Sequence, residues 1–266
     1  MPRSSRSSFV VLACLLVACG GAESSAPPAA TAGAEQSATA AEAAPATQAA
    51  SGASDAPSVV DPVKVSPDVF KVLLDGPRMR VIEATWKPGQ QDNPHGHPEL
   101  IAYALTEVHG IAYDDDGTPV SIRAKQGRVF VQSAVASHAF KNQGTSVAKL
   151  VIVELKDAPP APMPPGAAND AITASPDIYE FMGSDPKVKV LLATWKPGQR
   201  DEFHGHPATT LYAITDIQGN LYDADDKATP FTMKAGEARF EDPVRGHSFE
   251  NTGASPAQML IVEKRK

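Results

Sequence analysis

Six histidines occupy corresponding places in two parts of the chain, and their residue type suits a metal ion. The chain has seven histidines among its 266 residues, and six of them pair at a constant separation of 109 positions. These pairs are His95 with His204, His97 with His206, and His138 with His247. Neutral imidazole is a ligand for Fe, Mn, Ni, Cu, Co or Zn rather than for Ca or Mg. Each trio is therefore a candidate site for a divalent transition metal.

The spacing within each trio allows the imidazoles to meet. Side chains two residues apart on an extended strand point to the same face, so His95 and His97 can direct both rings at one point. His138 follows His97 by 41 residues and can supply the third ligand from a strand that the fold brings alongside. The alternative is that these histidines serve packing and hydrogen bonding. Because both copies keep all three positions, we favour the metal site.

The elements that must position these residues also occur twice. Residues 66–156 align with residues 175–265 without a gap, and 36 of the 91 aligned positions are identical, which indicates duplication of one folding unit. Each copy has short apolar and β-branched segments separated by turn signals, the pattern of an all-β sandwich or barrel. The segment that opens each copy, at Ser66 or Ser175, fits either a helical turn capped by that serine or an edge strand.

Two motifs in each copy resemble those of the cupin superfamily. Gly-x5-His-x-His begins at Gly89 and at Gly198, and Gly-x10-His-x3-Asn begins at Gly127 and at Gly236. The chain thus resembles a bicupin, which implies an all-β fold of two antiparallel jelly-roll (cupin) barrels in tandem, with the six histidines as metal ligands. A weaker resemblance, carried by HGHPE and VAKLVIVELK, is to small cupins described as beta-alanine degradation proteins.

The copies depart from the cupin pattern where a fourth ligand is usual. Cupins commonly have a glutamate a few residues after the second histidine, and here the first copy offers Glu99 whereas the second has Ala208. Glu99 is therefore a candidate fourth ligand in the first barrel, with a position on the barrel rim as the alternative. Three neutral ligands leave about three positions of an octahedron open. Such a site keeps its positive charge and favours an anionic, chelating substrate.

Three further pairs of repeated polar residues are candidates for contact with the metal site or its substrate. The amide and carboxylate pairs precede the histidines and could orient an imidazole, although we favour the alternative, a polar loop after a Pro-Gly turn. The tyrosine pair could donate a hydrogen bond or a proton to substrate, and core packing is its alternative. The pairs are Gln90 with Gln199, Asp92 with Asp201, and Tyr103 with Tyr212.

The start of the chain predicts export and lipid attachment. Arg3 and Arg6 precede an apolar run at residues 9–17, which is typical of a signal peptide and too short to span a membrane. The sequence Leu-Val-Ala-Cys ending at Cys19 resembles the lipobox of bacterial lipoproteins. That resemblance implies a signal peptide at residues 1–18 and a lipid on Cys19. Residues 19–57 are rich in Ala, Ser and Pro and are expected to form a disordered tether.

These features predict the domain order and the location. We expect the first barrel at residues 58–156, a proline-rich linker at 157–170 and the second barrel at 171–266. The protein should be extracytoplasmic and lipid-anchored, at the outer membrane and facing the periplasm. Its net charge of −7 argues against nucleic acid as a partner and against anionic lipid beyond the anchor. A small-molecule ligand is expected, and a homo-oligomer stays open.

Three functions are compatible with this sequence. The first is a metal-dependent, dioxygenase-like enzyme acting on a small anionic molecule, supported by open coordination positions inside a barrel. The second is a non-catalytic protein that binds a metal or a small ligand at the cell surface, supported by the absence of a duplicated acid that could clearly serve as general base. The third is a scaffold for protein contacts. Fold alone does not choose among them.

Overall fold

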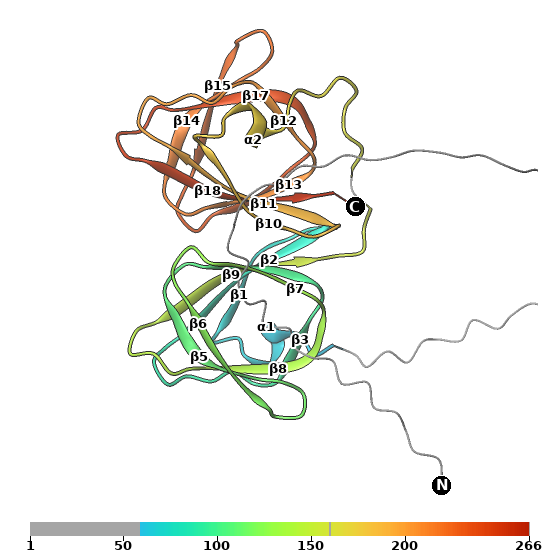
Figure 1. Cartoon of the computed structure of the whole chain (residues 1–266), viewed down its shortest axis with the longest axis vertical. Helices are drawn as coiled ribbons and strands as arrows, with labels where there is room; N and C mark the ends of the chain where they lie inside the picture. The colour runs from blue at the N-terminus through green and yellow to red at the C-terminus, as the bar shows by residue number, and fades with distance from the viewer. Residues whose placement is uncertain (1–58, 160, 266) are drawn as a thin grey trace, which may run out of the picture. The chain divides into compact units, whose positions relative to one another are not determined.

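The fold is almost entirely β-structure, as the sequence predicts (Figure 1). A computed structural model describes residues 59–159 and 161–265. The expected signal peptide, Cys19 and tether lie outside these residues. Among the described residues, no helix is long and apolar enough to cross a membrane.

The first barrel consists of two antiparallel sheets. The five-stranded sheet has the order β1-β2-β9-β4-β7, and the four-stranded sheet has the order β3-β8-β5-β6. A short helix, α1 (Pro62–Val65), precedes them. The strands are β1 (Phe70–Asp75), β2 (Met79–Trp86), β3 (His95–His97), β4 (Leu100–Ala104), β5 (Val108–Tyr113), β6 (Pro119–Ala124), β7 (Val129–Gln132), β8 (Val135–Asn142) and β9 (Ala148–Leu155).

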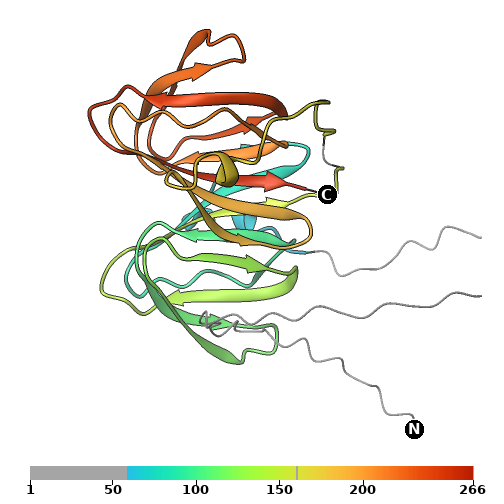
Figure 2. The same cartoon turned by 45° about the horizontal axis from the view of Figure 1, so that its top comes forward.

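The second barrel repeats this arrangement strand for strand. Its sheets have the orders β10-β11-β18-β13-β16 and β12-β17-β14-β15, and Figure 2 shows both barrels from another side. The elements are α2 (Ala171–Ala174), β10 (Tyr179–Ser184), β11 (Val188–Trp195), β12 (His204–His206), β13 (Thr209–Ala213), β14 (Ile217–Tyr222), β15 (Ala228–Met233), β16 (Ala238–Glu241), β17 (Val244–Asn251) and β18 (Ala257–Lys264).

The segment that opens each copy contains both of the expected alternatives in succession. In the first copy, helix α1 ends before Ser66 and strand β1 follows, at the edge of its sheet. Asp61, not Ser66, is the N-cap, since its carboxylate accepts from the amide of Val63 at 2.9 Å. Ser66 stands at the C-terminal end, and its Oγ accepts from the amide of Asn93 at 2.8 Å. This bond fixes the loop that leads into His95.

Alternate residues of the central strands serve two different apolar cores. In β2, Ile82, Ala84 and Trp86 pack inside the first barrel. Met79 and Val81 point to the other face and join an apolar cluster shared by both barrels. Residues from the second barrel in this cluster are Val188, Val190, Tyr212, Leu260 and Val262. The two barrels accordingly belong to one compact unit, and Figure 1 shows β2 and β9 beside β10 and β11 where the barrels meet.

Candidate metal centres

Each predicted histidine trio comes together inside its barrel. His95 and His97 lie on β3, and His138 lies on the paired strand β8, directly opposite His95 in the register. Their ligand atoms lie within 4.8 Å of one another, and the same holds for the trio of the second barrel. The strand period thus brings together the residues that are two apart, and antiparallel pairing supplies the third.

The hydrogen bonds of the paired histidines fix which ring nitrogen carries the proton. In the first barrel, Nδ1 of His95 lies 2.8 Å from the carbonyl oxygen of Asn93, and Nδ1 of His97 lies 2.6 Å from a carboxylate oxygen of Glu154. Both partners only accept, so in the neutral rings each Nδ1 is the protonated nitrogen. The Nε2 atoms then present lone pairs, and they lie 3.1 Å apart.

Two lone pairs at this distance repel each other unless a cation lies between them. The second barrel has the same arrangement, because Nδ1 of His204 and of His206 face acceptors at 2.7 and 2.8 Å. Their Nε2 atoms lie 3.0 Å apart. Nε2 of His138 is buried without a hydrogen-bond partner among the described residues. The donor set therefore fits a transition-metal ion, which would accept all three lone pairs.

Burial favours the neutral form of four of the six histidines, His95, His138, His204 and His247. Loss of solvation lowers the pKa of His95 to about 4 and the pKa of His138 to about 3. In the second barrel, burial lowers the pKa of His247 to about 3 and also lowers the pKa of His204. A ring that is neutral at pH 7 has a lone pair ready for a metal without first losing a proton.

A buried carboxylate orients one histidine in each barrel, and the sequence reasoning missed it. Glu154 lies on β9 and accepts from Nδ1 of His97. Arg80 lies 3.5 Å from the other oxygen of Glu154 and also pairs with Asp61 at 3.2 Å. Carboxylates in this position fix the tautomer of a metal-binding histidine and raise its basicity.

The second barrel carries the same network with lysine in place of arginine. Glu263 accepts from Nδ1 of His206, and Lys189 lies 2.8 Å from its other oxygen and also pairs with Asp170. Lys189 and Glu263 are both almost fully buried. The sequence held one signal of this role. The glutamate is identical in both copies and interrupts an otherwise apolar strand, VIVEL in the first copy and LIVEK in the second.

Asp92 and Asp201 are buried next to the trios. Asp92 accepts from the indole Nε1 of Trp86 at 2.8 Å and from the amide of Phe140 at 2.7 Å, and it lies 3.9 Å from Nδ1 of His95. Burial raises the pKa of Asp92 to about 6. The carboxylate thus ties the loop before β3 to β2 and β8, which sets the position of the histidine strand. Gln90 and Gln199, by contrast, lie in exposed turns and bridge to Asp68 and Asp177.

Glu99 and the repeated tyrosines lie away from the histidines. Glu99 forms an ion pair with Lys187 at the rim of the first barrel. Tyr103 and Tyr212 belong to the apolar cluster shared by the barrels, on the outer face of their strands. Burial raises the pKa of Tyr212 to about 12. In this structure none of the three reaches a trio.

One polar group contacts a trio in the second barrel only, and the sequence reasoning also missed it. Tyr179, on β10, places its phenol oxygen 2.7 Å from a carboxylate oxygen of Asp201 and 3.1 Å from Nε2 of His204. The corresponding residue of the first barrel is Phe70. Besides the exchange of Arg80 for Lys189, the second centre therefore differs from the first by a hydroxyl group at this position.

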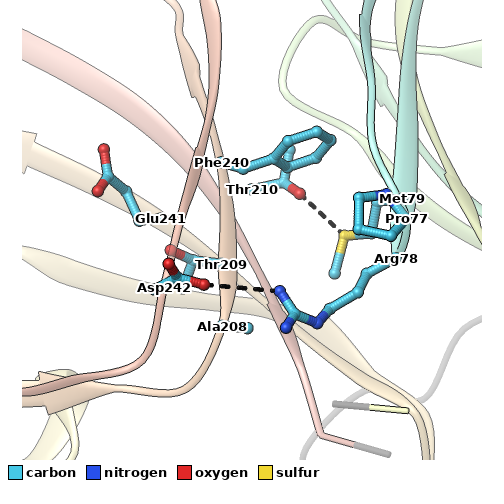
Figure 3. Close-up of a pocket in the computed structure, with 9 residues that line it drawn as sticks. All are labelled: Pro77, Arg78, Met79, Ala208, Thr209, Thr210, Phe240, Glu241 and Asp242. Atoms are coloured by element: carbon cyan, nitrogen blue, oxygen red, sulfur yellow. Dashed lines mark hydrogen bonds and ion pairs between the residues drawn. The ribbon is translucent and has the colours of Figure 1, made fainter. Parts of the chain in front are cut away.

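A surface pocket between the barrels does not include the histidines (Figure 3). Arg78 pairs with Asp242 at 3.7 Å on one side of it, and the hydroxyl of Thr210 donates to the sulfur of Met79 at 2.9 Å. The other lining residues are Pro77, Ala208, Thr209, Phe240 and Glu241. These contacts join the barrels, and the histidine trios lie in the barrel interiors rather than in this pocket.

Comparison with solved structures supports the fold. No protein-family model and no curated protein sequence matches the chain. An oxalate decarboxylase from Bacillus subtilis, solved at pH 4.6, matches with 16% identity and a TM-score of 0.52 over 77% of this chain and 70% of its own. AerE from Microcystis aeruginosa matches with 12% identity and a TM-score of 0.52 over 74% and 98%. A further structure, from work on the Mn(II) centres of the Bacillus subtilis oxalate decarboxylase, has 16% identity and a TM-score of 0.50 over 73% and 75%. The predicted bicupin fold is confirmed.

Proposed function

We propose that this bicupin binds one divalent transition metal ion in each barrel and uses at least one of them in a reaction of a small anionic molecule. The observation that carries the proposal is the approach of two unprotonated imidazole nitrogens to within 3.1 Å in the first barrel and 3.0 Å in the second. A divalent ion bound to both nitrogens makes that approach favourable.

The ligand set supports the class of substrate. Three neutral imidazoles do not reduce the charge of a divalent ion, so the remaining coordination positions favour an anion that binds through two atoms. Two of the structural neighbours are named as oxalate decarboxylases, and the study of one concerns its Mn(II) centres. Their names support the same class of metal and substrate. Oxalate is a small chelating dianion. In this chain the histidines would hold the ion, and Glu154 and Glu263 would orient His97 and His206.

Metal loading should give two equivalents per chain and stabilise the fold. We expect the apoprotein, supplied with Mn²⁺, Fe²⁺, Co²⁺, Ni²⁺, Cu²⁺ or Zn²⁺ in turn, to retain two equivalents of at least one of them after gel filtration. A ligand at 100 times its Kd stabilises the folded state by about 2.7 kcal/mol, so the same ion should raise the Tm. Less than about a tenth of an equivalent for every ion would contradict the proposal.

The second candidate is a non-catalytic binding protein. It is favoured by the first barrel, where no side chain of the described residues is placed as a free proton donor or acceptor beside the metal position. A panel of oxalate, other dicarboxylates, hydroxy acids, thiols and diketones separates the two. Turnover of any of them by the loaded protein, with or without O₂, favours the enzyme. Binding without turnover across the panel favours the binding protein.

We also propose that the mature protein is held at a bacterial membrane by a lipid on Cys19, outside the cytoplasm. The support is the signal-like run before Cys19 and the small-residue context of the lipobox-like sequence. Expressed in a bacterium with lipoprotein processing, the full chain should sediment with membranes, and Cys19→Ala should release it to the soluble fraction or block its processing. A wild-type chain found only in the soluble fraction would rule the anchor out.

A further inference from the structure

The two metal centres differ at one position that touches a ligand histidine. Phe70 and Tyr179 correspond in the repeat, and their rings pack on the first histidine of each trio in nearly the same way. The ring centroids lie 4.8 Å apart for Phe70 and His95, and 5.0 Å apart for Tyr179 and His204. The two barrels thus share the same packing of an aromatic ring on the first histidine, and the second barrel adds a hydroxyl group to that ring.

The hydroxyl of Tyr179 donates its proton to Asp201, the nearer of its two polar neighbours. The phenol oxygen lies 2.7 Å from a carboxylate oxygen of Asp201, a distance that requires a hydrogen between them because a carboxylate only accepts. Asp201 also accepts from the indole of Trp195 and from the amide of Phe249. The phenol therefore donates to Asp201, and its lone pairs are left for other partners.

One of these lone pairs faces an atom that has no proton to offer. His204 donates through Nδ1 to the carbonyl oxygen of Glu202, so its Nε2 is unprotonated. Nε2 nevertheless lies 3.1 Å from the phenol oxygen, nearly the same distance as its 3.0 Å approach to Nε2 of His206. The phenol oxygen of Tyr179 thus directs a lone pair toward Nε2 of His204, as Nε2 of His206 does. The same argument for a cation applies to it.

These separations match atoms that share one metal ion. Metal bonds to imidazole nitrogen and to oxygen are about 2.0–2.2 Å long, which places neighbouring ligands about 3 Å apart. Building on the proposed metal function, we propose that the phenol oxygen of Tyr179 is a fourth protein ligand in the second barrel. On binding an ion the phenol would release its proton, and the carboxylate of Asp201 is the acceptor already hydrogen-bonded to it. The first barrel has no such ligand.

The consequence is a division of roles between the barrels. Metal sites whose positions are taken by protein ligands are typically structural, whereas sites that keep open positions admit substrate. The first barrel, with three histidines and Phe70, keeps more positions open for a small anion. The second barrel, with an added anionic oxygen, should hold its ion more tightly and prefer harder or more highly charged ions such as Fe³⁺.

A ferric charge-transfer band tests this ligand directly. Tyrosinate bound to Fe³⁺ absorbs in the visible region, whereas imidazole and carboxylate ligands do not produce that band. The full chain is loaded with Fe²⁺ and oxidised in air, and iron content is measured beside the spectrum. We expect the band in the wild type and in His97→Ala, which keeps only the second centre. Tyr179→Phe should lose the band while retaining at least one equivalent of iron.

Matched variants separate the possible failures. Phe70→Tyr copies the second barrel into the first and should increase the band about twofold, because Asp92 is placed to accept the new hydroxyl as Asp201 does. Tyr212→Phe changes a buried tyrosine outside the centres and should leave the band intact. Tyr179→Phe has the residue that the first barrel already accommodates, and circular dichroism verifies its fold. Iron bound without a band, or a band that survives in Tyr179→Phe, overturns this ligand and leaves the proposed function standing. Absence of bound iron and of every other ion overturns both.

Discussion

Alanine in place of His97, or separately in place of His206, should lower the metal content of the protein from two equivalents to one. Each substitution removes one of three imidazoles that converge within 4.8 Å. It also removes the partner of a buried carboxylate, Glu154 or Glu263. We expect the affinity of the altered site to fall by at least about 100-fold, which corresponds to about 2.7 kcal/mol. Metal analysis after dialysis against a weak chelator, with isothermal titration of each variant, measures both quantities.

The chain itself offers the control for this experiment. His109 is the one histidine outside the trios, and the corresponding residue of the second copy is Gln218. His109→Gln should therefore keep two equivalents and an unchanged affinity. If His97→Ala and His206→Ala also keep two equivalents, the histidines are not the ligands. If one variant loses metal and the other does not, only one barrel binds an ion.

The histidine trios were accessible from the sequence for a physical reason. His95 and His97 share a face because strand side chains alternate with a period of two, and the repeat showed that His138 belongs with them. The short, evenly spaced segments predicted an all-β sandwich or barrel, and the resemblance to cupins implied the two jelly-roll barrels. Strand periodicity and the internal repeat can both be recognised in the sequence without knowing which strands pair.

The partners of the trios were harder to predict because they depend on strand pairing. Glu154 reaches His97 from β9, 57 residues away, and nothing in the local sequence states which strand will lie there. Tyr179 was overlooked for a different reason. A comparison that looks for identical positions in the two copies passes over Phe70 and Tyr179, although their difference is what distinguishes the centres.

For the other candidate residues, the sequence did not reveal which face of the strand each side chain occupies. All five residues of β4 are buried, since one face lines the first barrel and the other joins the cluster shared by both barrels. An apolar run of this kind does not reveal which face Tyr103 occupies. Glu99 follows His97 by two residues, but the chain bends between β3 and β4. The alternation that applies to His95 and His97 therefore does not extend to Glu99, whose side chain turns to Lys187 instead.

Replacing Lys189 by methionine should destabilise the protein by about 3–5 kcal/mol. The ammonium group lies 2.8 Å from Glu263, and the two side chains are 4% and 2% exposed. Removing one member of a buried ion pair leaves the other charge without compensation, and the cost is of this size. Because Glu263 orients His206, the metal affinity of the second barrel should change as well, by about 10- to 100-fold. Urea unfolding of the metal-free protein and a metal titration measure the two effects separately.

Three further variants decide whether charge or packing is responsible. Lys149→Met removes a partly exposed pair with Glu83 and should cost only about 0–1 kcal/mol. Lys189→Arg installs the residue that the first barrel has at Arg80, and it should restore most of the lost stability and affinity. Combining Lys189→Met with Glu263→Gln removes both charges, so it should recover much of the stability but not the metal affinity, since His206 then lacks its carboxylate. Equal instability of Lys189→Met and the double variant would show that the lysine acts by packing, and the carboxylate would then orient His206 without needing the cation beside it.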